Sequence, residues 1–312
     1  MTESAARRTA PDTPLRSLLF VPGDDEKKLA KGLKSDADAL IIDLEDSVSA
    51  RRKETARGIT STHLQQYAGS NGPALWVRVN PLSTSLALND LAAVVRYGPA
   101  GIVLPKIDGP EDLTALTHHL DALEAAYGLP RGSVKIIPVV TETPAAVLRL
   151  PELGRYAGLD RVYGFTWGAE DLSASLGATT NQGPDGRWAE TYRLARSATL
   201  LAAAAAGVHA IETLYANIGD LEGLAVDSRG SRAEGFTARI AIHPAQVGPI
   251  NVAFTPSESE LEHARRVVEA FSAGDTGVVA LDGRMLDAPH LRQARHILSV
   301  GAQRQESKDK WP

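Results

Sequence analysis

The feature that most constrains the fold is the regular alternation of short apolar runs with longer amphipathic segments. The apolar runs recur from the N-terminal region to about residue 242 and are rich in aliphatic and β-branched side chains. Nearly continuous hydrophobic runs are typical of parallel strands buried on both faces. We expect strands at Ser17–Val21, Ala39–Leu44, Ala74–Val79, Gly101–Pro105, Lys135–Thr141, Arg161–Phe165, Val208–Thr213 and Arg239–Ile242.

The segments between these runs show the spacing of amphipathic helices. Asp24 is a candidate N-cap for the first helix, and Gly207 is placed to end the helix before residue 208. We expect helices at Asp24–Lys34, Arg51–Tyr67, Leu86–Tyr97, Glu111–Tyr127, Pro144–Tyr156 and Trp188–Ala206.

Strict alternation of strands and helices predicts a parallel sheet, either closed into a barrel or open and doubly wound. Eight candidate strands favour the barrel. The first strand–helix turn lacks a G-x-G-x-x-G sequence, and no Walker-type G-x-x-x-x-G-K is present, so nucleotide-binding open sheets lose support. The sequence therefore predicts an α/β fold, a (β/α)8 TIM barrel with a C-terminal helical extension.

The extension begins where the alternation ends. Helices are expected at Pro256–Ala273 and Asp287–Ser299, with a short strand or turn at Thr276–Leu281 between them. A barrel does not need this tail, so we expect it to cover its own or a neighbouring active site. The expected parts are a disordered arm at 1–14, the catalytic barrel at 15–255, the extension at 256–303 and a frayed tail at 304–312.

Composition excludes several classes of protein. The net charge of −5 gives no general attraction to nucleic acid or to an acidic membrane. No apolar run reaches bilayer length, and the first residues lack the apolar core of a signal peptide. The chain has no cysteine, which excludes disulfides and thiolate chemistry and fits a reducing compartment. We expect a cytoplasmic protein that binds neither nucleic acid nor membrane.

Charged side chains follow several of the expected strands. Because residues at the carboxyl ends of barrel strands converge on one site, these side chains should meet in a small volume. Stability alone does not explain such a gathering, since unpaired buried charges are costly. The residues at these strand ends are Asp43, Glu45, Asp46, Arg78, Asn80, Lys106, Glu142, Glu170, Asp171 and His243.

A hard divalent cation would account for the excess of carboxylates. Mg²⁺ prefers carboxylate oxygens, usually one or two from the protein. Glu142 and Asp171 are the best pair because they follow consecutive strands. Asp43, Glu45 and Asp46 are expected around them, orienting waters and neutralising Arg78 or Lys106. Any one of these acids alone is better explained by a helix cap or an ion pair, and Asp171 in particular could cap a short helix.

Three further positions have two explanations each. Arg78 suits a bidentate grip on a substrate carboxylate, or a buried ion pair with the acids of the second strand. His243 either positions a loop or binds a ligand. Lys27 and Lys31 share one face of the first helix, where they hold phosphates or form a solvated surface.

Several strings of the chain resemble the citrate lyase β-subunit / malyl-CoA lyase family of the aldolase/citrate lyase superfamily. The resemblance runs in order from about Arg16 to Leu298. The strings are Arg16–Gly23 (RSLLFVPG), Asp43–Val48 (DLEDSV), Arg78–Asn80 (RVN), Glu142-Thr143, Gly168–Ser173 (GAEDLS), Ile242–Val247 (IHPAQV) and Asn251–Pro256 (NVAFTP).

This resemblance implies a (β/α)8 barrel, Mg²⁺ as cofactor, an acyl-CoA with a small 2-oxo or hydroxy acid, and a homotrimer or hexamer. Asp287 matches the acid that CoA-lyase and thioesterase members supply from the tail of a neighbouring subunit. The other matching positions are Glu142 and Asp171 for the metal, Arg78 for the substrate carboxylate, and Phe20, Lys27, Lys31, Ile242 and His243 for CoA.

The sequence departs from the family pattern at two places. Ala238-Arg239 replaces the common Gly-Lys, and Glu212 replaces the Asp that commonly ends the seventh strand. We expect either change to alter the acyl or CoA pocket. The resemblance therefore indicates the family more specifically than it indicates the substrate.

Together these features predict a Mg²⁺-dependent carbon–carbon lyase. It would cleave or form a β-hydroxyacyl-CoA of the malyl-CoA or citramalyl-CoA type, giving acetyl-CoA and a 2-oxo acid. Asp287 is the expected base, and Arg78 is expected to offset the charge of the developing alkoxide. Four rival activities stay open: a malyl-CoA thioesterase or a malate synthase-like activity on the same site, a CoA-independent aldolase, and a citrate lyase β-subunit that works with an acyl carrier protein.

Overall fold

The computed structural model describes residues 14–156, 158–272 and 277–309. The expected arm at 1–14 therefore lies almost entirely outside the described residues. The chain forms two compact units, the first ending at Asn251 and the second beginning at Val252.

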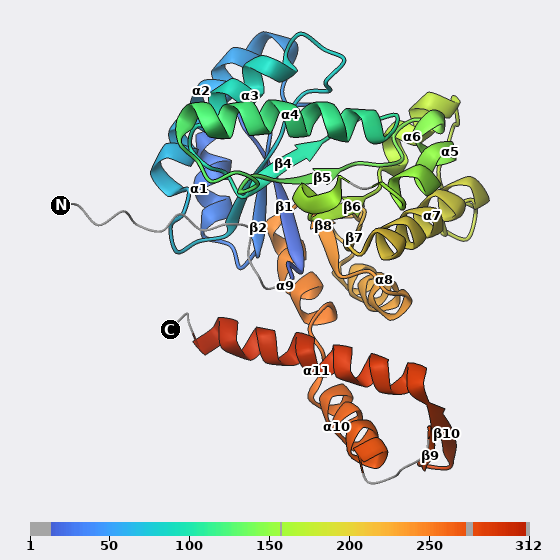
Figure 1. Cartoon of the computed structure of the whole chain (residues 1–312). Helices are drawn as coiled ribbons and strands as arrows, with labels where there is room; N and C mark the ends of the chain where they lie inside the picture. The colour runs from blue at the N-terminus through green and yellow to red at the C-terminus, as the bar shows by residue number, and fades with distance from the viewer. Residues whose placement is uncertain (1–13, 157, 273–276, 310–312) are drawn as a thin grey trace, which may run out of the picture. The chain divides into compact units, whose positions relative to one another are not determined.

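The first unit is a nearly closed barrel of eight parallel strands, with helices around it (Figure 1). Neighbouring strands follow the order β5-β4-β3-β2-β1-β8-β7-β6. The expected fold class is confirmed. The strands are β1 (Ser17–Pro22), β2 (Ala39–Asp43), β3 (Ala74–Arg78), β4 (Gly101–Leu104), β5 (Lys135–Pro138), β6 (Gly164–Thr166), β7 (His209–Glu212) and β8 (Ala238–Ala241).

The barrel closes between β5 and β6 through two isolated parallel bridges, Ile136↔Val162 and Val139↔Thr166. The backbone N–H of Val140 donates to the carbonyl of Thr166 over 2.8 Å at the upper bridge. Strand β6 is short and begins later than the sequence predicted, because residues 159–161 form a 3-10 turn. Isolated bridges, and not a continuous ladder of paired residues, therefore join β5 to β6.

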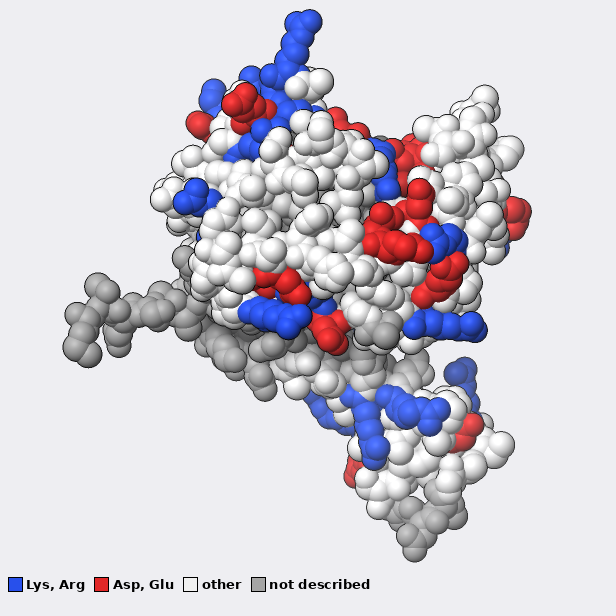
Figure 2. All heavy atoms as spheres, turned by 45° about the horizontal axis from the view of Figure 1, so that its top comes forward, with Lys and Arg blue, Asp and Glu red and all other residues white. Residues whose placement is uncertain are grey.

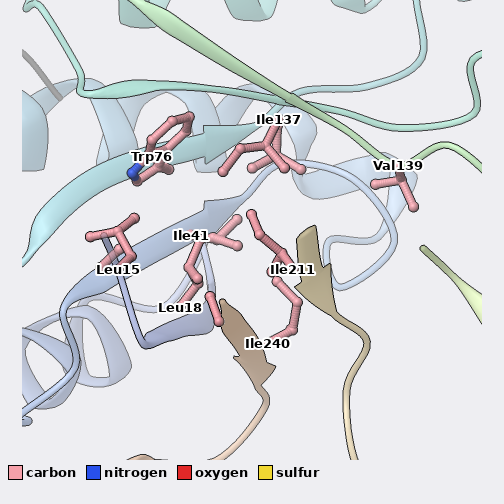
Figure 3. Packing of buried hydrophobic residues seen from close by; sticks show 11 residues of the cluster. Leu15, Leu18, Ile41, Trp76, Ile137, Val139, Ile211 and Ile240 are labelled. Carbon is pink, nitrogen blue, oxygen red and sulfur yellow. The ribbon is translucent and has the colours of Figure 1, made fainter. Parts of the chain in front are cut away.

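Alternate residues of each strand point into the barrel and pack as layers (Figure 3). Leu18, Ile41, Trp76 and Ile240 belong to this buried interior. Trp76 requires glycine opposite it, since a Cβ on Gly101 would lie 2.2 Å from the indole Cζ3. The interior is thus a filled core, and a site can form only at one of its ends.

The helices largely match the predicted positions. Three were absent from the prediction: α6, α8 and α9. Helix α8 contains Gly223 and Gly230, which weaken helical propensity and blur its apolar face. The helices of this region are α1 (Glu26–Leu33), α2 (Lys53–Tyr67), α3 (Ala87–Val95), α4 (Pro110–Tyr127), α5 (Pro144–Leu153), α6 (Ala169–Leu176), α7 (Glu190–Ala206), α8 (Leu221–Glu234) and α9 (Pro244–Ala253).

One predicted cap was wrong. Asp25, not Asp24, caps α1, since its side chain accepts from the backbone N–H of Lys28 over 3.0 Å. The Asp24 carboxylate is held instead by Arg52 over 2.6 Å. Gly207 ends α7 in the left-handed conformation, at φ +69°, as predicted.

The second unit contains two packed helices and a hairpin. These are α10 (Glu258–Ser272), α11 (Ala288–Asp309), and the antiparallel strands β9 (Val278–Leu281) and β10 (Arg284–Asp287). The turn is Asp282-Gly283, both at positive φ. Asp-Gly is a strong signal for a two-residue hairpin turn, so this hairpin was readable from the sequence although the prediction placed only one strand or turn there.

No helix among the described residues is long and apolar enough to cross a membrane. On the face drawn in Figure 2, basic and acidic side chains alternate in small groups.

Candidate active site

The strand register places an arginine next to an acid at the mouth of the barrel. Asp43 ends β2 and pairs in register with Arg78, which ends β3. The Asp43 carboxylate accepts from Nε and Nη2 of Arg78, each over 2.7 Å. Burial alone would raise the pKa of Asp43, but the bonds from Arg78 lower it below its ordinary value. This pair is ionic and buried.

Arg78 keeps donors free despite this pair. The bidentate bond uses Nε–H and one hydrogen of Nη2, and Nη1 lies 3.0 Å from Glu45 Oε2. The guanidinium stacks on Phe20, with its carbon 4.7 Å from the ring centroid. Ion pairing with the strand-two acids and a grip on a ligand are therefore compatible.

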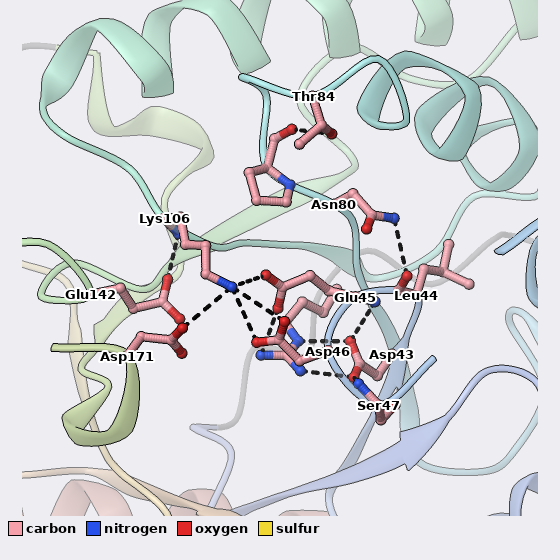
Figure 4. Close-up of polar contacts among 12 residues, drawn as sticks. Asp43, Leu44, Glu45, Asp46, Ser47, Asn80, Thr84, Lys106, Glu142 and Asp171 are labelled. Atoms are coloured by element: carbon pink, nitrogen blue, oxygen red, sulfur yellow. Dashed lines mark hydrogen bonds and ion pairs between the residues drawn. The ribbon is translucent and has the colours of Figure 1, made fainter. Parts of the chain in front are cut away.

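Lys106 follows β4 and connects the acids from both sides of the barrel mouth (Figure 4). Its Nζ contacts Glu45, lies 3.1 Å from Asp46 Oδ2 and lies 3.3 Å from Asp171 Oδ1. Its backbone N–H donates to Glu142. The residue has φ +52°, which is rare outside glycine and is found at functional sites. Burial lowers and these carboxylates raise the pKa of Lys106, and the net direction is upward.

Glu142 and Asp171 lie together at this mouth, with their carboxyl groups side by side in Figure 4. Glu142 precedes the N-cap of α5, Thr143, and Asp171 lies in the first turn of α6. The N-cap of α6 is Gly168, so Asp171 is not the cap that its sequence position also suggested. A Cβ on Gly168 would lie 3.2 Å from Glu142 Cγ. Glycine at this position therefore lets the start of α6 approach the Glu142 side chain closely.

The two acids line a cavity of about 80 Å³ that also contains Arg78 and Phe20. The polar groups lie at the barrel mouth, and aliphatic side chains of the barrel interior form the deeper wall. The remaining lining residues are Val103, Val139, Thr166, Trp167, Gly168, Ala169, Glu170, Thr213, Leu214 and Ile240. The volume suits a small organic acid.

Glu142 has a perturbed acidity. Burial is the largest cause and raises its pKa from 4.5 to about 8, assisted by the charges of Asp171 and Glu45 and opposed by the N–H of Lys106. Burial likewise raises the pKa of Glu45. Carboxylates with raised pKa values at the mouth of a barrel mark the site where charge compensation is incomplete.

The donor set fits a hard divalent cation. Two carboxylates side by side on one cavity wall are what Mg²⁺ ordinarily takes from a protein. Among the described residues, no group of three or more His, Asp or Glu side chains is placed to hold a metal. Glu142 and Asp171 are thus the candidate ligands that the structure brings together.

The positions that the resemblance linked to CoA lie on three elements. Phe20 lines the cavity from β1, and Lys27 and Lys31 are exposed on α1. His243 follows β8, and its Nδ1 accepts from the N–H of Ala245 over 3.2 Å. This contact supports the explanation that His243 positions the loop. Ile242 donates its N–H to the buried Gln246 over 2.9 Å.

Asp287 lies at the end of β10 in the second unit. Its carboxylate Oδ1 is 2.6 Å from Nδ1 of His290, one turn into α11. Both side chains are about half exposed. The acid is therefore available to solvent within its own unit.

The sequence prediction missed Lys53, which holds the loop that carries the strand-two acids. Its Nζ donates to the carbonyls of Leu44 and Glu45 and to Asn80 Oδ1, over 2.7 to 2.8 Å. A lysine in the first turn of a helix opposes the helix dipole. That local conflict was the available signal.

The two departures from the family pattern, Glu212 and Arg239, are buried residues that form ion pairs. Glu212 accepts from Trp167 Nε1 over 2.6 Å and pairs with Arg196 over 2.7 Å. Arg239 donates to Ser228 over 2.8 Å and pairs with Asp227. Neither lines the cavity, but Glu212 holds the indole that does.

Comparison with known proteins shows the family of the chain. Residues 16–244 match the HpcH/HpaI aldolase/citrate lyase family. The citrate lyase subunit beta of Escherichia coli K12 is 35% identical over 287 residues, covering 91% of this chain and 92% of that protein. The mitochondrial citramalyl-CoA lyase of Rattus norvegicus is 31% identical over 304 residues, covering 92% and 86%.

Solved structures show the same relationship. A Mycobacterium tuberculosis CitE structure in complex with magnesium, acetoacetate and coenzyme A has a TM-score of 0.75 and 30% identity, covering 93% of this chain and 98% of that one. The chain belongs to the HpcH/HpaI aldolase/citrate lyase family, and it is an enzyme of the lyase class. The family suggested by the sequence strings is confirmed.

The raised pKa of Glu142 predicts a pH-dependent stability. The folded protein binds this proton more tightly than the unfolded chain, so the stabilisation is complete below pH 4.5 and is lost as the pH rises through about 8. Relative to Glu142→Gln, the wild type should lose on the order of a few kcal/mol from about pH 5 to about pH 9. Thermal unfolding with a chelator present measures this, with the exposed Glu190→Gln as control. Parallel pH profiles for wild type and Glu142→Gln would contradict the assignment.

Proposed function

We propose that the chain is a Mg²⁺-dependent carbon–carbon lyase that reversibly cleaves a β-hydroxyacyl-CoA of the malyl-CoA or citramalyl-CoA type into acetyl-CoA and a 2-oxo acid. The observation that carries the proposal is the meeting of Glu142 and Asp171 on one cavity wall beside Arg78. The rat relative is named a citramalyl-CoA lyase, and the mycobacterial structure holds magnesium and coenzyme A, which supports this choice.

Glu142 and Asp171 are the residues that would hold Mg²⁺. When bound there, the ion supplies Lewis-acid polarisation of the oxo-acid carbonyl. The remaining donors of Arg78 bind the carboxylate of the small acid and offset negative charge on its oxygen. Asp43 keeps the guanidinium in position, and Glu45 and Asp46 balance Lys106. The barrel wall excludes water from the deeper part of the cavity.

Asp287 is the proposed base. In the synthetic direction its carboxylate takes a proton from the methyl carbon of acetyl-CoA, and that carbon bonds to the oxo-acid carbonyl carbon as the carbonyl π bond opens. The resulting alkoxide takes up a proton from solvent and becomes the hydroxyl. In the cleavage direction the hydroxyl gives up its proton to solvent, the C–C bond breaks as the oxo-acid carbonyl re-forms, and protonated Asp287 gives a proton to the departing acetyl carbon. Its 2.6 Å contact with His290 orients the carboxylate.

The oligomer and the extension belong to the same proposal. We propose a homotrimer or hexamer in which residues 256–303 cover an active site, with Asp287 serving the barrel of a neighbouring subunit. Phe20, Lys27, Lys31, Ile242 and His243 are the proposed CoA contacts. The exposed ammonium groups of α1 suit the phosphates of CoA.

A second candidate is a citrate lyase β-subunit acting on an acyl carrier protein, favoured by the 35% identity to the Escherichia coli subunit. Titration of the isolated protein with CoA esters separates this candidate from the lyase, because a partner-dependent subunit should bind free CoA poorly. The same site could also support a thioesterase in which Asp287 activates water, a malate synthase-like activity or a CoA-independent aldolase.

Product analysis tests the main proposal. The protein is incubated with Mg²⁺, acetyl-CoA and either glyoxylate, pyruvate or oxaloacetate, and the CoA products are identified by mass. A β-hydroxyacyl-CoA should form with at least one oxo acid, whereas a thioesterase yields free CoA and a hydroxy acid. Glu142→Ala and Asp171→Ala should each reduce turnover by roughly 100-fold or more. Glu190→Ala, an exposed first-turn acid on α7, is the control. Near-normal turnover by Glu142→Ala would remove the metal assignment.

The α1 lysines provide a test of CoA recognition. Charge reversal at Lys27 and Lys31 together should raise the KM for acyl-CoA by roughly 10-fold or more with little change in kcat, because two phosphate contacts become repulsive. Lys135→Glu, a partly exposed position at the start of β5, is the control. Steady-state kinetics with varied acyl-CoA measure the effect. An unchanged KM would exclude both lysines from CoA recognition, whereas a CoA-independent aldolase would show no dependence of turnover on acyl-CoA.

Sharing of the site between subunits has its own signature. Glu142→Ala and Asp287→Ala proteins are each inactive, but co-assembly should restore about a quarter of wild-type turnover, because a random mixture joins intact halves at that frequency. Activity of the co-expressed, co-purified proteins measures this. No recovery despite mixed oligomers would place Asp287 in its own subunit's site or outside catalysis.

A further inference from the structure

Thr166 is a buried polar side chain in the wall of the cavity. It is the last residue of β6, it is 3% exposed, and it lines the cavity that contains Arg78, Glu142 and Asp171. Three other side chains of the lining, Val103, Val139 and Ile240, are aliphatic and belong to the buried barrel interior. A hydroxyl in such a wall requires an explanation.

The Thr166 hydroxyl has no hydrogen-bond partner within the described part of the chain. Its backbone is not short of partners, because the carbonyl accepts from Val140 N–H over 2.8 Å where the barrel closes. Leaving a buried hydroxyl unsatisfied destabilises a fold, so such a group in a native protein calls for a ligand or a function.

Among the described residues, five buried side chains contain an unsatisfied polar atom, and they differ in their surroundings. Glu45 has its Oε2 within 3.0 Å of Arg78 as an ion pair. His63, Trp76 and Tyr192 are absent from the cavity lining. Thr166 is therefore the one of these five that lines the cavity. This placement points to a partner that enters from the mouth.

We propose that the Thr166 hydroxyl donates a hydrogen bond to an oxygen of the bound 2-oxo acid, making Thr166 a substrate-binding residue. The inference rests on the proposed function. Every oxygen of an oxo acid is an acceptor, and a hydroxyl can donate to it, whereas the acids at the mouth cannot when ionised. The Arg78 guanidinium then holds the acid from the mouth, and Thr166 holds it from the wall.

Two replacements separate this role from a structural one. Thr166→Val keeps the shape and removes the hydroxyl, while Thr166→Ser keeps the hydroxyl. Binding of pyruvate and of glyoxylate is measured by calorimetry with Mg²⁺ present, and the Tm is measured without either acid. Thr199→Val is the control, because that buried hydroxyl already donates to the carbonyl of Ala195 over 2.9 Å within α7.

We expect Thr166→Val to weaken oxo-acid binding by roughly 10- to 100-fold, the effect of a bond to a charged group, with an unchanged or higher Tm. Thr166→Ser should bind within a few-fold of the wild type, and Thr199→Val should bind normally. Wild-type affinity in Thr166→Val, or weaker binding accompanied by a lower Tm, would overturn the inference. If the wild type bound no oxo acid at all, the proposed function would fail, and this inference with it.

Discussion

The ion pair between Asp43 and Arg78 is the interaction on which the rest of the site depends. Strand register makes the two residues neighbours at the last position of β2 and β3, just above the filled barrel interior. Both side chains are largely buried there, so removing either partner would leave an unpaired buried charge. The pair fixes the plane of the guanidinium and the free edge that faces the cavity.

The charges around this pair do not balance. Asp43, Glu45, Asp46, Glu142 and Asp171 supply five carboxyl groups, whereas Arg78 and Lys106 supply the two cations in contact with them. Burial is the largest cause of the raised pKa of Glu142, and the negative charges of Asp171 and Glu45 raise it further. A divalent cation at Glu142 and Asp171 would relieve the excess of negative charge. The proposed metal site and the raised pKa of Glu142 therefore share a physical cause.

The residues that depart from the family pattern, Glu212 and Arg239, lie outside the cavity lining. Glu212 is buried between Arg196 and the indole N–H of Trp167, and the indole forms part of the cavity wall. Glu212 adds no charge to the cavity lining, because its carboxylate is held by Arg196 and the indole N–H. Arg239 is likewise committed to Asp227 and Ser228.

The sequence by itself determined the barrel and the identity of the residues at its mouth. Buried parallel strands are continuous apolar runs, and their carboxyl ends must converge, so Arg78, Glu142 and Asp171 were predictable from chain position alone. The Asp282-Gly283 turn was also readable from local sequence, but the hairpin was not predicted. Helix α8 was not predicted because its two glycines weaken the helical pattern. Only the tertiary structure decided that one edge of the Arg78 guanidinium binds Asp43 and that Lys106 contacts acids from separate strands. It also decided that the Thr166 hydroxyl has no hydrogen-bond partner among the described residues. Pairing, burial and unsatisfied hydrogen bonds depend on every neighbour in space, and residues distant in the chain become neighbours only when the barrel closes.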